Sequence, residues 1–240
     1  MSTIVEIDGT DWRINGALTY AGREHQGRRI EGLLLNSRMV QAVFDDTNPV
    51  TRRNWSYPDM GVWDPDRNTQ EFCDMLPLYR AHGLLGVTVG MQGGGAMYYP
   101  EVFENYVNSA FLPDGSLKQP YLDRLAKIVD AADEQGMVVF VNYFYWKQQR
   151  FESEGAVRAA VENMTAFEAA LDAGVSWGYY DQGYGCGETQ TKCDWLERER
   201  ETSFDDLSGF QTVPINWGVN TPHKRAFFAR LRDVTGSGLS

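Results

Sequence analysis

The sequence of 240 residues lacks long hydrophobic runs, and no stretch approaches the roughly 18 apolar residues needed to span a bilayer. Its first eight residues, MSTIVEID, contain neither a basic segment nor an apolar core of the kind found in secretory signals. We therefore expect a cytoplasmic protein that has no membrane partner.

Positive charge is also scarce, with 22 Lys and Arg against 33 Asp and Glu, which gives a formal net charge of −11. Binding to nucleic acid depends largely on Lys and Arg contacts to phosphate. This charge balance argues against nucleic-acid binding as a function.

Histidine is nearly absent: His25, His82 and His223 are the three in the chain, and none has a partner at the spacing of a metal site. A zinc site and a His-based catalytic triad are therefore not expected. We expect neither a metal nor another cofactor.

Cysteine is equally rare, with three residues and no closely spaced metal-binding pair. Cys73 falls inside a helical pattern, which predicts a small core residue. Cys186 and Cys193 share one loop, where two free thiols and a disulfide are both open, although a cytoplasmic protein favours thiols.

The sequence does contain one pattern three times. In residues 82–90, 135–145 and 173–181 a glycine is followed by a short apolar run and then by polar or aromatic residues. Helix, glycine and buried strand in repetition are typical of a parallel α/β sheet. Ligands of such sheets bind at the carboxyl ends of the strands. A fourth buried strand is predicted at 32–35, so Asn36 and Arg38 should follow its end.

We expect a single barrel-like domain over residues 1–240. Turn signals at Asp8-Gly9 and Asn15-Gly16 predict an N-terminal β-ribbon over residues 1–20, at the end of the domain without the active site. Residues 30–174 would form the first three βα units, and residues 175–240 the last unit with a long loop.

Between the first strand and its helix, residues 45–68 are rich in Asp, Pro and Trp, which favours an ordered binding loop. Asn68 and Glu71 have the spacing of a capping box and predict the start of the next helix. Pro77 within that helix should kink or interrupt it.

Several segments together resemble a group of bacterial glycoside-hydrolase-like (β/α)8 TIM-barrel proteins. They are EGLLLNSRMVQ (31–41), WDPDRNT (63–69), QGG (92–94) and VPINWG (213–218). The segment SWGYYD (176–181) is similar to the eighth strand of retaining glycosidase barrels, whose Trp lines the sugar subsite. The resemblance covers nearly the whole chain, and it implies a protein that acts on carbohydrate by carboxylate acid/base catalysis without a cofactor.

The chain departs from that family in its middle. Such glycosidases carry one catalytic Glu at the end of strand four and another at the end of strand seven, and neither is found here. The helix expected over 156–173 leads directly into the strand that resembles the eighth, with a possible join near 165–168. The sequence therefore predicts an incomplete or internally shortened TIM-type (β/α) barrel that lacks strands four to seven.

Glycoside hydrolysis needs two carboxyl groups, roughly 5 Å apart for retention or about 6.5–9.5 Å apart for inversion. Asp45 and Asp46 after the first strand and Asp181 after the last are the candidates, because first and last strands are neighbours in a closed barrel. Glu188 could reach the site from its loop. The structural alternative is that Asp45 and Asp46 hold the long loop and Asp181 caps a turn.

Aromatic rings can stack on the apolar faces of sugars, and four aromatic residues are candidates for this role: Trp63, Tyr145, Trp177 and Trp217. Six further side chains offer hydrogen bonds suited to hydroxyl groups: Asn36, Arg38, Gln92, Asn142, Gln148 and Asn216. Either set could instead fill the mouth of the barrel or bond to backbone. The triglycine at 93–95 lacks the lysine of a phosphate-binding loop, so a close-packed turn is favoured.

Three interpretations remain open. The protein is a glycoside hydrolase acting on a carbohydrate or another polyhydroxylated small molecule, a non-catalytic carbohydrate-binding remnant, or an incomplete barrel that works only as an assembly. Two copies would supply eight strands, so a homodimer is a further expectation.

Overall fold

The computed structural model describes residues 3–94, 105–145, 148, 150–171, 175–177, 217–220 and 222–238. Its centre is a four-stranded parallel sheet whose strands lie side by side in the order in which they occur in the chain. The strands are β6 (Asn36–Arg38), β7 (Gly86–Gly90), β8 (Val138–Asn142) and β9 (Val175–Trp177). The predicted α/β class with a parallel sheet is confirmed, and within the described residues the sheet does not close into a barrel.

The first strand begins later than the sequence predicts. Leu33 is 44% exposed and lies outside the sheet, whereas Asn36 and Arg38, expected after the strand, are part of it. The reason is the N-terminal ribbon: Gly32 accepts a hydrogen bond from the Trp12 amide and donates one to Thr19 O. Residues 30–33 are thereby held against the ribbon, and Asn36 pairs with Gly86 at the amino end of β7.

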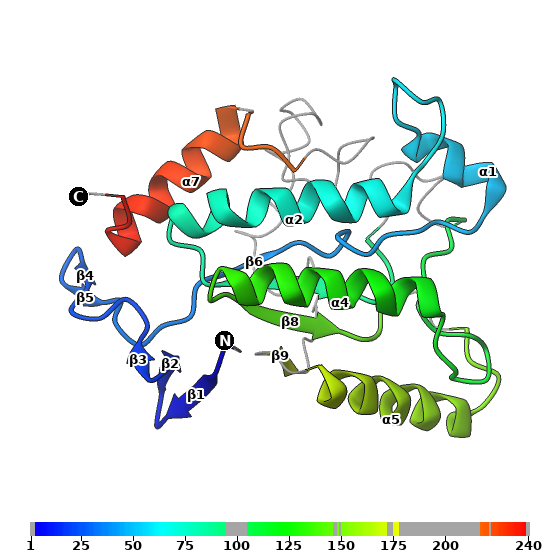
Figure 1. Cartoon of the computed structure of the whole chain (residues 1–240), viewed down its shortest axis with the longest axis horizontal. Helices are drawn as coiled ribbons and strands as arrows, with labels where there is room; N and C mark the ends of the chain where they lie inside the picture. Colours follow the sequence, from blue (N-terminus) through cyan, green and yellow to red (C-terminus); the bar gives the residue numbers. More distant parts are fainter. Residues whose placement is uncertain are drawn as a thin grey trace, which may run out of the picture.

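Four long helices accompany the sheet in the described part of the chain: α2 (Pro65–Ala81), α4 (Gln119–Glu134), α5 (Glu154–Ala170) and α7 (Pro222–Thr235). Figure 1 shows α2 and α4 side by side, with α7 next to α2 and α5 on the other side of α4. A short helix α1 (Pro49–Arg52) and a 3-10 turn η1 (Arg53–Trp55) lie at the end towards which the strand β8 points.

The start of α2 differs from the predicted capping box. Asp64 is the N-cap, because its carboxylate accepts hydrogen bonds from the amides of Asp66 and Arg67, both at 3.0 Å. Pro65 occupies the first helical position, where its missing N–H costs nothing. Asn68 is instead a buried residue inside the helix, and the helix continues past Pro77 to Ala81.

Alternation along the strands gives the sheet two different faces. Val87, Val89, Val139 and Val141 belong to the buried core with Phe72, Leu76, Leu125 and Ile128 of α2 and α4. Since neighbouring residues of a strand point to opposite faces, Thr88 and Phe140 lie on the other side. We call this second side the inner face.

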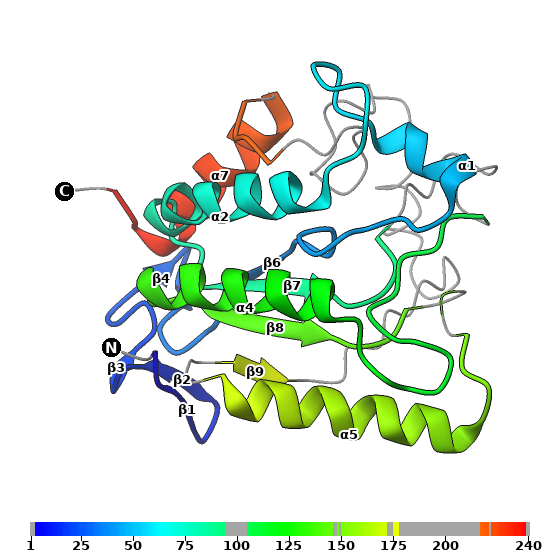
Figure 2. The ribbon, with the colours of Figure 1, turned by 45° about the vertical axis from the view of Figure 1, so that its right-hand side comes forward.

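The predicted N-terminal ribbon is present as an antiparallel sheet of β1 (Val5–Asp8), β2 (Asp11–Ile14) and β3 (Ala17–Leu18). A second small hairpin, β4 (Glu24–His25) with β5 (Arg28–Arg29), follows it. Figure 2 places the ribbon near the amino ends of β7 and β8, away from α1. The rings of Trp12 and Phe140 form a T-shaped pair on the inner face, with centroids 6.0 Å apart.

In the residues that the structure describes, no helix combines the length and apolar character that a membrane span requires.

Candidate functional site

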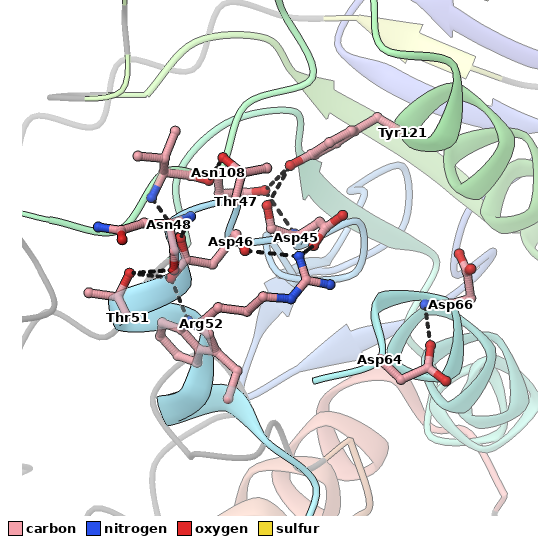
Figure 3. Close-up of polar contacts among 12 residues, drawn as sticks. Asp45, Asp46, Thr47, Asn48, Thr51, Arg52, Asp64, Asp66, Asn108 and Tyr121 are labelled. Atoms are coloured by element: carbon pink, nitrogen blue, oxygen red, sulfur yellow. Dashed lines mark hydrogen bonds and ion pairs between the residues drawn. The ribbon is translucent and has the colours of Figure 1, made fainter. Parts of the chain in front are cut away.

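The chain segments that follow β6, β7 and β8 meet at the carboxyl ends of these strands. Asn108 joins them: its amide nitrogen Nδ2 donates to Gly93 O at 2.6 Å, and its Oδ1 accepts from the Asp45 amide at 2.9 Å. Tyr121 of α4 also donates to Asn108 Oδ1 at 2.9 Å and to Asp45 O at 2.6 Å. Figure 3 shows Tyr121 reaching from α4 to this point. These hydrogen bonds therefore fix the loops at the candidate site relative to one another.

Asp46 lies among these loops and is fully buried. Its Oδ1 accepts hydrogen bonds from the amides of Asn48 and Val107 at 3.0 and 2.9 Å. Its Oδ2 accepts from Thr51 Oγ1 at 2.6 Å and from Trp55 Nε1 at 2.9 Å. Four donors occupy both oxygens, so the geometry supports a structural role for Asp46: it holds α1 and η1 against the segment around Val107.

Asp45 is more accessible, with 15% of its side chain exposed, and it is held by two arginines. Arg52 Nη1 lies 2.9 Å from Oδ1, and Arg124 Nη1 lies 3.5 Å from Oδ2. Burial raises the pKa of Asp45, while the positive charges of Arg52 and Arg124 act in the opposite direction. Arg124 also binds Asp66 at 2.7 Å, so the cluster links α1, α2 and α4.

The predicted amide side chains Gln92 and Gln148 are buried and bonded within the protein. Gln92 donates to Ser109 Oγ at 2.9 Å and accepts from the Tyr145 amide at 3.1 Å. Gln148 accepts from the Asn108 amide and donates to Tyr106 O, both at 3.0 Å. Both residues therefore connect loops at the carboxyl end, and their polar atoms are engaged by the chain itself.

The predicted stacking residues Trp63 and Trp217 lie in the core instead of at the sheet end. Trp63 is stacked on Tyr57, with centroids 5.6 Å apart and planes 4° apart. Trp217 packs on Phe72 at 4.9 Å and donates through Nε1 to Asn68 Oδ1 at 2.9 Å. Both are almost fully buried, so neither ring has a face open to a sugar.

Three other predicted residues lie on the inner face of the sheet. Asn36 and Arg38 lie on the same side of β6, and their register partners on β7 are Gly86 and Thr88. The hydroxyl of Thr88 donates to Asn36 Oδ1 at 3.3 Å. Asn142 pairs with Gly90 and lies two residues beyond Phe140 on β8, hence on the same face.

Tyr145 stands next to this group at the carboxyl end. The Arg38 guanidinium lies 5.9 Å from the centre of the Tyr145 ring. Tyr145 also packs against Gly93, where an added Cβ would lie 2.2 Å from Tyr145 Cγ. The positive φ angles of Gly93 and Gly94, 78° and 86°, fit the close-packed turn predicted for this segment.

Asp181, Glu188 and Asn216 lie outside the described residues. Trp177 is described as part of β9 through its backbone, which pairs with Val141. The strands β6 and β9 form the two edges of the described sheet, separated by β7 and β8. The expected contact between the first and last strands, which would bring Asp45 towards Asp181, is therefore not formed in the described residues.

Sequence reasoning missed several residues that the structure makes central. Asn108 and Arg124 lie in a loop and on a helix, and no local motif distinguishes them. Glu168 carried a signal, because it follows the buried Met164 by four residues and shares its helix face. Its Oε2 accepts from Tyr143 OH at 2.6 Å, and burial raises its pKa to about 7.

Within the described ranges no group of three or more His, Cys, Asp or Glu side chains is placed to hold a metal ion. Cys73 is a buried core residue as predicted, and burial raises the pKa of its thiol to about 11.

Comparison of this chain with protein-family models, with curated proteins and with solved structures finds no match.

Proposed function

We propose that the protein is a glycoside-hydrolase-like protein that binds a carbohydrate at the inner face and the carboxyl ends of its parallel sheet. In this proposal the four strands correspond to half of a (β/α)8 barrel, and the inner face corresponds to the wall of the barrel interior. The sequence motifs at 31–41, 63–69, 92–94 and 213–218 supply the link to that family.

The main support is the alternation in β6, β7 and β8, which puts Asn36, Arg38, Thr88 and Asn142 on the face away from the helices. A sheet face that serves only as a core would be apolar, as the valines of the opposite face are. This group combines neutral donors and acceptors with one guanidinium group, which lies 5.9 Å from the centre of the buried Tyr145 ring. Such a combination suits a polyhydroxylated ligand.

The carboxylates that the structure describes support the binding of a carbohydrate better than its hydrolysis. Asp46 already accepts four hydrogen bonds, and Asp45 is paired with Arg52 and Arg124. A glycosidase needs one free carboxylate and one carboxylic acid at a fixed separation. Asp181 and Glu188 are the remaining candidates, and we propose hydrolysis as the second function, which depends first on Asp181.

Isothermal titration calorimetry with methyl glycosides of the common hexoses and pentoses tests the binding proposal. We expect Arg38→Met to weaken binding about 10- to 100-fold, because a hydrogen bond from a charged group contributes roughly 1.5–3 kcal/mol. Arg28→Met, at an exposed arginine of β5, is the matched control and should bind as the wild type does. Wild-type protein that binds none of these sugars would contradict the proposal.

Release of nitrophenol from aryl-glycosides distinguishes a hydrolase from a binding protein. Activity in the wild type that is lost in Asp181→Asn supports catalysis through Asp181. Activity that the substitution leaves unchanged removes Asp181 from the mechanism.

A further inference from the structure

Gln41 lies just beyond β6, at the end of the segment 31–41, and it is 1% exposed. Its backbone carbonyl accepts hydrogen bonds from the Phe44 amide at 3.1 Å and from Asn68 Nδ2 at 2.8 Å. Asn68 is in turn held by Trp217 Nε1 at 2.9 Å. Gln41 is thus fixed to the start of α2.

The orientation of the Gln41 amide follows from one contact. Nε2 donates to Gly94 O at 2.6 Å. Exchanging the nitrogen and oxygen of the amide would bring two acceptors together, so the assignment of the two atoms is decided by chemistry. Oε1 is therefore a fixed acceptor, and it is buried without a donor from the part of the chain that the structure describes.

The carbonyl of Gly94 that orients Gln41 is itself held in place. A Cβ added to Gly94 would lie 3.0 Å from Gln41 Cγ, and one added to Gly93 would meet the Tyr145 ring. Asn108 Nδ2 holds the carbonyl of Gly93 at 2.6 Å. The two glycines are therefore packed between Gln41 and Tyr145, and this turn connects Gln41 to the group formed by Arg38 and Tyr145.

A buried acceptor without a donor destabilises the folded protein, and such groups are uncommon unless water or a ligand satisfies them. We propose that Gln41 is a binding residue whose Oε1 accepts a hydrogen bond from a hydroxyl group of the bound carbohydrate. This inference rests on the proposed function and adds to it a specific contact. It assigns to the ligand a neutral hydroxyl donor near the turn at Gly93 and Gly94.

The test uses titration calorimetry on the full chain with methyl glycosides and, for each one that binds, its monodeoxy forms. We expect Gln41→Met to weaken binding about three- to tenfold, the effect of losing one neutral hydrogen bond. One monodeoxy sugar should bind more weakly than its parent to the wild type but equally to Gln41→Met. A role of Gln41 in folding alone would not remove that difference.

Gln119→Met is the matched control, since Gln119 is exposed at the start of α4. Gln41→Asn, which keeps the amide but withdraws its oxygen, replaces Gln41→Met if thermal unfolding shows that the latter does not fold. If every monodeoxy sugar loses the same affinity in the wild type as in Gln41→Met, a water and not the sugar satisfies Oε1. That result would overturn the inference, while the proposed function would stand. Absence of any sugar binding by the wild type would overturn the proposed function and this inference with it.

Discussion

At the scale of single residues, burial and local donors decide what each carboxylate can do. Asp45 and Asp46 are neighbours in sequence, yet Asp46 is surrounded by four donors and Asp45 is held by two arginines. Glu168 differs from both, because it is buried with Tyr143 as the donor to Oε2 and its Oε1 has no partner in the described residues. A carboxylate in that setting is costly, which explains its raised pKa of about 7.

Glu168 should make the stability of the protein depend on pH. Its pKa is raised in the folded state, from a usual value of 4.5 to about 7. The protonated form therefore stabilises the fold fully below about pH 4.5, and this contribution is lost as pH rises towards 7. We expect the loss to be on the order of 2 kcal/mol, allowing for partial screening by solvent.

Urea denaturation at intervals from pH 4 to pH 8.5 measures this effect as the difference in the free energy of unfolding between the wild type and Glu168→Gln. The difference should change between pH 4.5 and 7 and be constant above that range. Glu162→Gln, on the exposed side of the same helix, is the control and should follow the wild type. A flat difference across the whole range would show that folding does not raise the pKa of Glu168, and it would contradict this expectation.

At the scale of helices and strands, local patterns predicted the elements better than their faces and ends. The apolar residues of α4 recur at helical spacing from Leu122 to Ala132, and this stripe is the buried face of the helix. In α5 the buried positions are Ala156, Ala160, Met164 and Glu168, whereas Val161 is 38% exposed. In α7 the two adjacent phenylalanines differ: Phe227 is 51% exposed, whereas Phe228 packs on Tyr79 with ring centroids 5.1 Å apart.

The start of α2 offers a test at this scale. Asp64→Ala removes the acceptor for two amides of the first turn and should lower the free energy of unfolding by about 1 kcal/mol. Amide hydrogen exchange of Asp66 and Arg67 should become faster at the same time. Asp130→Ala, an exposed position within α4, should change both measurements little. Unchanged exchange in Asp64→Ala would contradict the assignment of Asp64 as the cap.

At the scale of the whole molecule, the described sheet is parallel and has β6 and β9 at its edges. Its helical face is covered by α2 and α4, while its inner face carries the polar residues of the proposed site. Parallel sheets generally have both faces covered, and strand edges favour pairing with another chain. A second copy would supply the four further strands of an eight-stranded barrel.

We therefore expect a homodimer in solution. Size-exclusion chromatography with multi-angle light scattering should give twice the 27.2 kDa mass of one chain. Asn36→Pro in the edge strand β6 should shift the species towards the monomer, because Leu35 and Met39 bond to β7, so the Asn36 amide points to the open edge, and proline cannot donate a backbone hydrogen bond. The same substitution in the ribbon, Ala17→Pro in β3, is the control for an effect on folding alone. A stable monomer of the wild type would contradict this expectation.

The sequence by itself determined the α/β class, the three glycine-led strands at 86–90, 138–142 and 175–177, and most of the helices. These depend on local periodicity and on turns at glycine, which act within a few residues. Only the tertiary structure decided that Asn36 and Arg38 belong to the first strand, because the ribbon holds residues 30–33 from a distance in sequence. It also decided the roles of Asp46, Gln92, Trp63 and Trp217, since their partners come from separate loops and helices and no local pattern specifies them.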